Sequence, residues 1–346
     1  MKKSPVSVFV LLSLALTLLS TSLFAELSLP HFFSDQMVLQ RDGHAAIWGN
    51  ADPNAEVKVT FKEKNAVTKA DGSGQWHLKI ETGAADATGA PLNVTSGDES
   101  VTIADVLVGE VWFASGQSNM VFTMNRVPEY AEVIAESNHP GLRMFNAPMV
   151  TAVDPQNDIE GEWTSASPET VPGYSAVAFF FARKLHFELG IPVGVIKSAW
   201  GGKPVETFTS REALNTLPGT KALVDTALER DGAYDPDRAA TAHEKQLALW
   251  EEAIATWRTL APEERQAKRP PRKPALQKRA LDTEGQPGVL FNSMIHPFIG
   301  YTMRGAIWYQ GEGNAKPGAV PYDQTLPLLH KVEGKIVVPA RSPVID

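Results

Sequence analysis

Three short apolar runs in this chain each end at a polar loop that contains glycine, and this pattern constrains the fold most strongly. The runs occupy residues 106–114, 193–196 and 304–309. A strand that gives way to such a loop is typical of the carboxyl edge of an α/β sheet, where ligands bind. Between the first two runs, residues 175–189 have apolar side chains at helical spacing, and Gly190 follows as a C-cap. This alternation of strands and helices predicts an α/β sheet.

The first polar loop carries a serine that can act as a nucleophile. It reads GQSNM over residues 116–120, so Gly116 permits a tight turn and Ser118 begins the next helix. Free backbone N–H groups in the first turn of a helix can bind a developing oxyanion. Met120 stands where the lipase elbow G-x-S-x-G has its second glycine. Read alone, the segment fits a catalytic serine and an ordinary serine N-cap equally well.

The second and third loops place further polar groups at the same edge. The second reads SAWGGKP over 198–204, and its glycines would let the backbone approach a ligand, although a tight turn requires glycine equally. The third reads QGEGNA over 310–315, and an amide side chain there can donate to an oxyanion. Because the carboxyl ends of strands meet at one edge of the sheet, the three loops together favour a catalytic Ser118.

The first 105 residues predict a leader followed by β-structure. Residues 1–25 have the charged start, apolar run and final small residue of a secretory signal peptide, so we expect a secreted or periplasmic protein. The apolar run is short for a transmembrane span, so no stable membrane insertion is expected after cleavage; an uncleaved anchor is the alternative. Residues 26–105 contain short apolar-rich strands between turn residues, which predicts a β-sandwich-like module.

The composition narrows the range of partners. The 346 residues include no cysteine, so the hydrophobic core and not disulfides must hold the fold together. A net charge of −8 argues against nucleic acid as a partner. The sequence has no clustered histidines and cysteines of the kind that bind structural zinc, and we expect neither a metal nor another cofactor.

Residues 212–288 interrupt the α/β alternation. Within them, residues 239–260 have the pattern of a polar amphipathic helix, and residues 265–279 are basic and rich in proline. The proline content and the acidic charge of the whole chain favour a solvated insertion. An anion-binding patch is the alternative interpretation of the basic residues.

Taken together, the loops resemble the signature blocks of a known family. GQSNM at 116–120, SAWGG at 198–202 and WYQGEGNA at 308–315 are similar to those of the sialate O-acetylesterases, in the SGNH hydrolase superfamily. FSDQMVLQR at 33–41 and LFNSMI at 290–295 extend the likeness over nearly the whole mature chain. The resemblance implies a flavodoxin-like three-layer α/β/α esterase domain over residues 106–346. It also implies removal of O-acetyl groups from sialic acid or related glycans.

The resemblance implies roles for individual residues as well. Ser118 would be the nucleophile, and its backbone N–H would contribute to the oxyanion hole. The other donors would be a backbone N–H of Gly201 or Gly202 and the side chain of Asn314. The substrate would be bound by Gln117, Trp200, Gln310 and Glu312. Gly313 stands where the family usually has serine, which removes a hydroxyl but leaves Asn314 in place.

The family's catalytic Asp-x-x-His is not found in this sequence. None of the eight histidines has an aspartate three residues before it, and residues 331–346 do not resemble the family. A serine nucleophile needs a base, so the general base is unknown; His296 and His330 are the histidines nearest to the third block. We therefore expect a C-terminally truncated core with impaired esterase activity. A non-catalytic protein that binds acetylated glycans, or an inactive truncated gene product, is the alternative.

Overall fold

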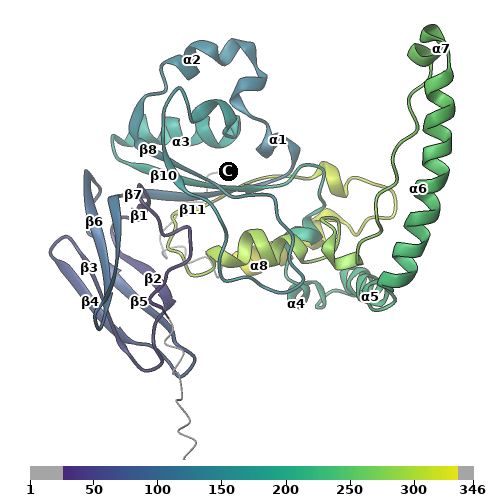
Figure 1. Cartoon of the computed structure of the whole chain (residues 1–346). Coiled ribbons are helices and arrows are strands. Elements are labelled where there is room, and N and C mark those ends of the chain that lie inside the picture. The colour runs from purple at the N-terminus through teal and green to yellow at the C-terminus, as the bar shows by residue number, and fades with distance from the viewer. Residues whose placement is uncertain (1–25, 334–346) are drawn as a thin grey trace, which may run out of the picture.

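Eleven strands and eight α-helices form the part of the chain that the structure describes, residues 26–333 of a computed structural model (Figure 1). The expected signal peptide and residues 334–346 lie outside the described residues. The strands are β1 Val38–Gln40, β2 His44–Asn50, β3 Glu56–Phe61, β4 Lys64–Lys69, β5 Gln75–Glu81, β6 Asp86–Ser96, β7 Glu99–Gly116, β8 His139–Asn146, β9 Trp163–Ala166, β10 Val193–Ala199 and β11 Gly305–Tyr309. The helices are α1 Ser118–Val121, α2 Ala131–Ala135, α3 Ala176–Leu189, α4 Arg211–Leu214, α5 Pro218–Gly232, α6 Pro236–Thr259, α7 Pro262–Ala267 and α8 Tyr322–Glu333.

One mixed sheet organises the fold. Its strands follow the order β4-β3-β6-β7-β10-β8-β9, and β1 and β11 also pair with β7. β7 pairs in parallel with β10 and β11, and β8 pairs in parallel with β10. α3 packs against β10 and β8 on one face, and α8 lies below the other face (Figure 1). The predicted α/β class is confirmed.

The strands of the expected β-sandwich-like module are connected to the central sheet, and whether they form a sandwich stays a prediction. β3, β4 and β6 join the central sheet through β7, while β2 and β5 pair only with each other. β7 is 18 residues long and crosses the predicted boundary between residues 105 and 106. Asp105 lies at a φ of 54° inside this strand, next to the irregular pairing with β6. The division into two domains at this position stays a prediction.

Local sequence explains the helix that covers the sheet. The side chain of Ser175 caps α3 by accepting a hydrogen bond from the Ala178 N–H, and Gly190 ends the helix at a φ of 65°. These are the bounds that the residue spacing predicts. By contrast, the helix expected after Gly116 is the single turn of α1.

Helices fill most of the region that interrupts the strands. α4 to α7 lie between residues 211 and 267, and residues 269–279 then return without helix or strand. α6 stands away from the rest of the molecule, with α7 at its far end (Figure 1). The predicted amphipathic helix over 239–260 is confirmed as part of α6.

Candidate active site

The register of three parallel strands brings their carboxyl ends level. Gly116, the last residue of β7, is paired with Ala199 of β10 on one side and Tyr309 of β11 on the other. A Cβ at Gly116 would lie 2.2 Å from the carbonyl oxygen of Tyr309, and the φ of Gly116 is +140°. Only glycine fits this position without strain. The three polar loops therefore leave the sheet side by side.

Ser118 lies exposed at the start of α1, two residues beyond the end of the sheet. A Cβ on Gly201 would lie 3.7 Å from the Cβ of Ser118, so the backbone of the second loop is close to this serine. The Trp200 N–H of that loop donates a hydrogen bond of 3.1 Å to the Gly116 carbonyl at the end of β7. Gly202 has a φ of +71° and open space around its α-carbon. The structure thus brings Ser118 and Gly201 together.

Asn314 is held at the same edge by a buried network. It belongs to a 3₁₀ turn, Glu312–Asn314, that follows β11. Its Oδ1 accepts hydrogen bonds from the Val205 N–H at 2.9 Å and from Gln310 Nε2 at 2.7 Å. Its Nδ2 donates to Glu206 Oε2 at 2.8 Å. An amide nitrogen has two hydrogens, and the second one has no acceptor among residues 26–333, so it remains free for a ligand.

Two of the residues expected to bind substrate instead connect the loops in this structure. The Oε1 of buried Gln117 accepts a hydrogen bond of 3.0 Å from the Gly313 N–H. Glu312 Oε1 accepts a hydrogen bond of 2.9 Å from Asn119 Nδ2. Both contacts hold α1 against the third loop. Whether Gln117 and Glu312 also touch a substrate stays a prediction.

The other two expected substrate residues differ in their surroundings. Trp200 is half-buried against the core, and its ring centroid lies 5.6 Å from the Nζ of Lys203. Gln310 Nε2 donates to the Lys203 carbonyl at 3.1 Å as well as to Asn314. Gln310 Oε1 is buried and has no hydrogen-bond partner in the described part of the chain. A buried acceptor without a partner carries an energetic cost, which a bound hydroxyl would remove.

Glu206 is a site residue that the sequence analysis missed. It lies in the 3₁₀ turn Val205–Phe208 just after the second loop, and only 4% of its surface is exposed. Its carboxylate fixes the orientation of the Asn314 amide. One feature of the sequence could have identified Glu206. It is an acidic residue between apolar Val205 and Phe208, shortly after the glycine pair.

No histidine in residues 26–329 forms a hydrogen bond with Ser118. His31 pairs with Asp158, His186 Nδ1 contacts the Ile191 carbonyl, and His296 Nδ1 contacts the Gln156 carbonyl. The side chain of His330 lies outside the described residues. The general base therefore stays unassigned.

A cavity of about 480 Å³ adjoins Asn314. Gly313 and Glu206 also line it, and α5 and the loop after β11 contribute the basic residues Arg230 and Lys316. Within the described residues, neither of these two cations forms an ion pair. The wall of this cavity therefore carries two cations without an ion pair and one carboxylate, that of Glu206.

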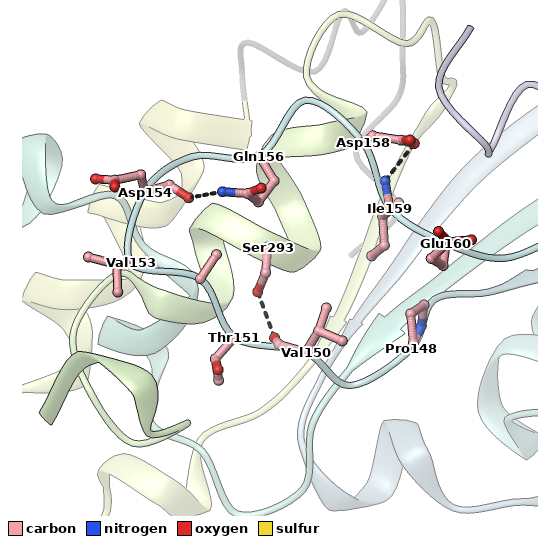
Figure 2. A pocket seen from close by; sticks show the side chains of 11 residues that line it. Pro148, Val150, Thr151, Val153, Asp154, Gln156, Asp158, Ile159, Glu160 and Ser293 are labelled. Carbon is pink, nitrogen blue, oxygen red and sulfur yellow. Dashed lines mark hydrogen bonds between the residues drawn. The ribbon is translucent and has the colours of Figure 1, made fainter. Parts of the chain in front are cut away.

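A second cavity, of about 500 Å³, lies in the loop between β8 and β9 (Figure 2). Its walls include the acidic side chains of Asp154, Asp158 and Glu160, and Ser293 donates a hydrogen bond to the Val150 carbonyl across it. None of the predicted site residues lines this cavity. Of the predicted site residues, Asn314 alone lines the first cavity, and Ser118 lines neither of the two.

The chain is similar in sequence and in structure to known acetylesterases. The chain is 28% identical over 335 residues to the sialate O-acetylesterase of Mus musculus, covering 90% of this chain and 57% of that protein. It is 27% identical over 317 residues to the sialate O-acetylesterase of Rattus norvegicus, covering 86% and 54%. The resemblance to the sialate O-acetylesterases is confirmed. No family model matches the chain.

A solved structure supports the same resemblance. The fold is similar to a carbohydrate acetylesterase from Xanthomonas citri, with a TM-score of 0.68 and 28% sequence identity. The match covers 90% of this chain and 58% of that one. The chain thus spans about half the length of the sialate O-acetylesterases it matches, and somewhat more than half of the solved acetylesterase.

Among residues 26–333, no helix combines the length and the apolar character needed to cross a bilayer.

Proposed function

We propose that this chain hydrolyses acetyl esters on sugars, with Ser118 as the nucleophile. The observation that carries the proposal is the meeting of three loops at one sheet edge. Ser118, Gly201 and Asn314 follow three different strands, β7, β10 and β11, whose carboxyl ends are level, and the Gly201 backbone lies close to Ser118. A nucleophile beside convergent hydrogen-bond donors is the arrangement that acyl transfer requires.

In the proposed reaction, Ser118 Oγ attacks the acetyl carbonyl carbon, and its proton passes to solvent water, which returns a proton to the sugar oxygen as that oxygen leaves. The carbonyl oxygen becomes an oxyanion, which accepts hydrogen bonds from Asn314 Nδ2 and from the backbone N–H groups of Ser118 and of Gly201 or Gly202. The C–O bond to the sugar then breaks, and the sugar oxygen leaves with a proton. Water attacks the acetyl-serine, which releases acetate and restores the serine.

The substrate we propose is an O-acetylated sialic acid or a related glycan. The unpartnered Oε1 of Gln310 suits a sugar hydroxyl. Arg230 and Lys316, on the wall of the adjoining cavity, suit the carboxylate of an acidic sugar. Trp200 offers an aromatic face near the same loops. Both relatives in sequence are named for sialate esters, which fits this choice.

We further propose that the activity of the described part alone is low. A serine hydroxyl is a weak nucleophile without a base, and no histidine of residues 26–329 contacts Ser118. The oxyanion donors and substrate binding still give residual catalysis in enzymes that have lost their base. This same observation favours the second candidate function, a protein that binds acetylated glycans without turnover.

Release of acetate distinguishes the two candidates. We expect the purified chain to release acetate slowly from O-acetylated sialic acid, and Ser118→Ala to abolish this release. Ser100→Ala, at an exposed serine of β7 far from the candidate site in sequence, is the matched control and should behave as the parent. Glycan binding that persists in both variants, with no acetate released by the parent, would support the binding protein instead.

We also propose that residues 1–25 direct secretion and are removed. Sequencing of the mature N-terminus should then begin at Glu26. A mature chain that retains Met1 and stays with the membrane fraction would favour the uncleaved anchor.

A further inference from the structure

The arm formed by α6 and the segment that returns beside it is separate from the candidate active site. α6 has 24 residues and is therefore about 36 Å long. It stands away from the sheet, with α7 at its far end (Figure 1). The return segment after α7, residues 268–279, is called the basic strip here. Most of it, residues 269–279, has neither helix nor strand.

The basic strip carries unneutralised positive charge. It contains six basic and no acidic residues, although the whole chain has a net charge of −8. Arg279 pairs with Asp231, and Lys278 lies near Glu284. The remaining four basic side chains are exposed and form no ion pair with any residue between 26 and 329. These four are Lys268, Arg269, Arg272 and Lys273.

Side chains of α6 and of the short segment before it hold the strip in place. Trp257 Nε1 donates to the Lys268 carbonyl at 3.1 Å, and Trp250 Nε1 donates to the Pro271 carbonyl at 3.0 Å. Near the other end, the Tyr234 hydroxyl donates to the Gln277 carbonyl at 3.1 Å. Three prolines restrict the backbone further. Because the strip is already held in place, ordering it on binding would cost less free energy than ordering a flexible segment.

The position of the strip separates it from the acidic body. Trp250, which contacts Pro271, lies 14 residues beyond the start of α6, which corresponds to about 20 Å along the helix. Charges in solution at physiological salt are screened over about 8 Å. The negative charge of the body thus has little effect on an anion at the four unpaired basic residues, and the arm itself, residues 236–279, has ten basic and six acidic residues.

We propose that the basic strip binds an acidic polysaccharide, a linear polymer with a carboxylate or sulfate on successive units. An extended, proline-stiffened row of cations matches such a polymer along its length. Surfaces that enter lipid usually present an amphipathic helix with a free apolar face. Here the basic residues lie outside any helix, and the rings of Trp250 and Trp257 lie under Lys273 and Arg265. The site does not involve Ser118, so it is a function beyond ester hydrolysis.

Binding of the purified chain to polygalacturonate tests this proposal. The test variant combines Lys268→Gln, Arg269→Gln and Arg272→Gln. It retains Lys273, whose ammonium lies over the ring of Trp250. The control variant combines Lys58→Gln, Lys69→Gln and Lys79→Gln, three exposed lysines of the N-terminal strands, and changes the net charge equally. We expect the test variant to bind at least about tenfold more weakly at low salt, and the control to bind as the parent.

Several outcomes would overturn the proposal. One is equal weakening in both variants, because net charge alone would then explain the binding. Another is binding to neutral dextran that equals binding to polygalacturonate. A third is strip-dependent binding to phosphatidylglycerol vesicles without binding to polygalacturonate, which would identify a membrane surface as the partner. The thermal unfolding temperature of each variant, and the binding of Ser118→Ala, should match those of the parent.

Discussion

At the scale of single residues, Glu206 holds the Asn314 side chain of the candidate site in one orientation. Its carboxylate is nearly fully buried and accepts a hydrogen bond from Asn314 Nδ2. The Val205 N–H and Gln310 fix the other end of the same amide. Asn314 can therefore aim its second N–H at one place. Glu206 is a positioning residue in this account, because it acts through Asn314.

Glu206→Ala should lower kcat for an aryl acetate by about tenfold to a hundredfold, with little change in KM, because an oxyanion donor acts mainly in the transition state. Glu206→Gln retains an acceptor oxygen and should recover most of the activity. Glu63→Ala, at an exposed acid in the turn between β3 and β4, is the control. A rise in KM with unchanged kcat would contradict the positioning role.

Lys197 offers a second test at this scale. It lies buried on β10, and burial lowers the pKa of its ammonium to about 8. The unfolded chain binds this proton up to a pH near 10.5, so the lysine destabilises the fold fully below pH 8 and less as the pH rises. Lys197→Met should therefore raise the free energy of unfolding at pH 7 by on the order of 2 kcal/mol.

The increase in the free energy of unfolding caused by Lys197→Met should become smaller as the pH approaches 10.5. Denaturant titrations at several pH values measure this change. Lys79→Met, at an exposed lysine of β5, is the matched control and should change stability little at any pH. A gain that is constant across this pH range would mean that the ammonium of Lys197 is not the cause.

At the scale of elements, the end of β7 sets the geometry of the site. Gly116 has no room for a Cβ beside the Tyr309 carbonyl. Gly116→Ala should lower the free energy of unfolding by about 2 kcal/mol or more and also reduce activity, because β11 must move away from β7. Gly232→Ala, where a Cβ meets nothing within 4 Å, is the control for chemical denaturation. Equal stability of the two variants would contradict the close approach.

The sequence predicted the strands that end at the site because each is a short apolar run closed by glycine. It did not predict β4 or β6, many of whose side chains are exposed or polar, since their pairing depends on neighbouring strands. Ser118, Gly201 and Asn314 could be placed at one edge from strand ends alone. The burial of Glu206 could not be predicted from the sequence, because a buried carboxylate is stable only with a partner that the tertiary fold supplies.

At the scale of the whole molecule, contacts join the N-terminal strands to the last part of the sheet. The Tyr301 hydroxyl donates to the Val38 carbonyl at 2.7 Å, and Thr302 contacts His44 in β2. One buried cluster includes both Ile47 and Phe298. We therefore expect residues 26–333 to unfold in a single calorimetric transition. Two separated transitions would indicate that the N-terminal strands form an independent domain.

The central claim is that Ser118 accepts an acetyl group beside the Asn314 amide. Mass spectrometry of the chain after incubation with an aryl acetate tests it most directly. We predict an acetyl group on the peptide that contains Ser118, and a slow loss of this group, because no histidine of residues 26–329 contacts Ser118 to activate the attacking water. The Ser118→Ala variant should show no acetylated peptide. Acetylation elsewhere in the chain, equal in the parent and in Ser118→Ala, would contradict the account.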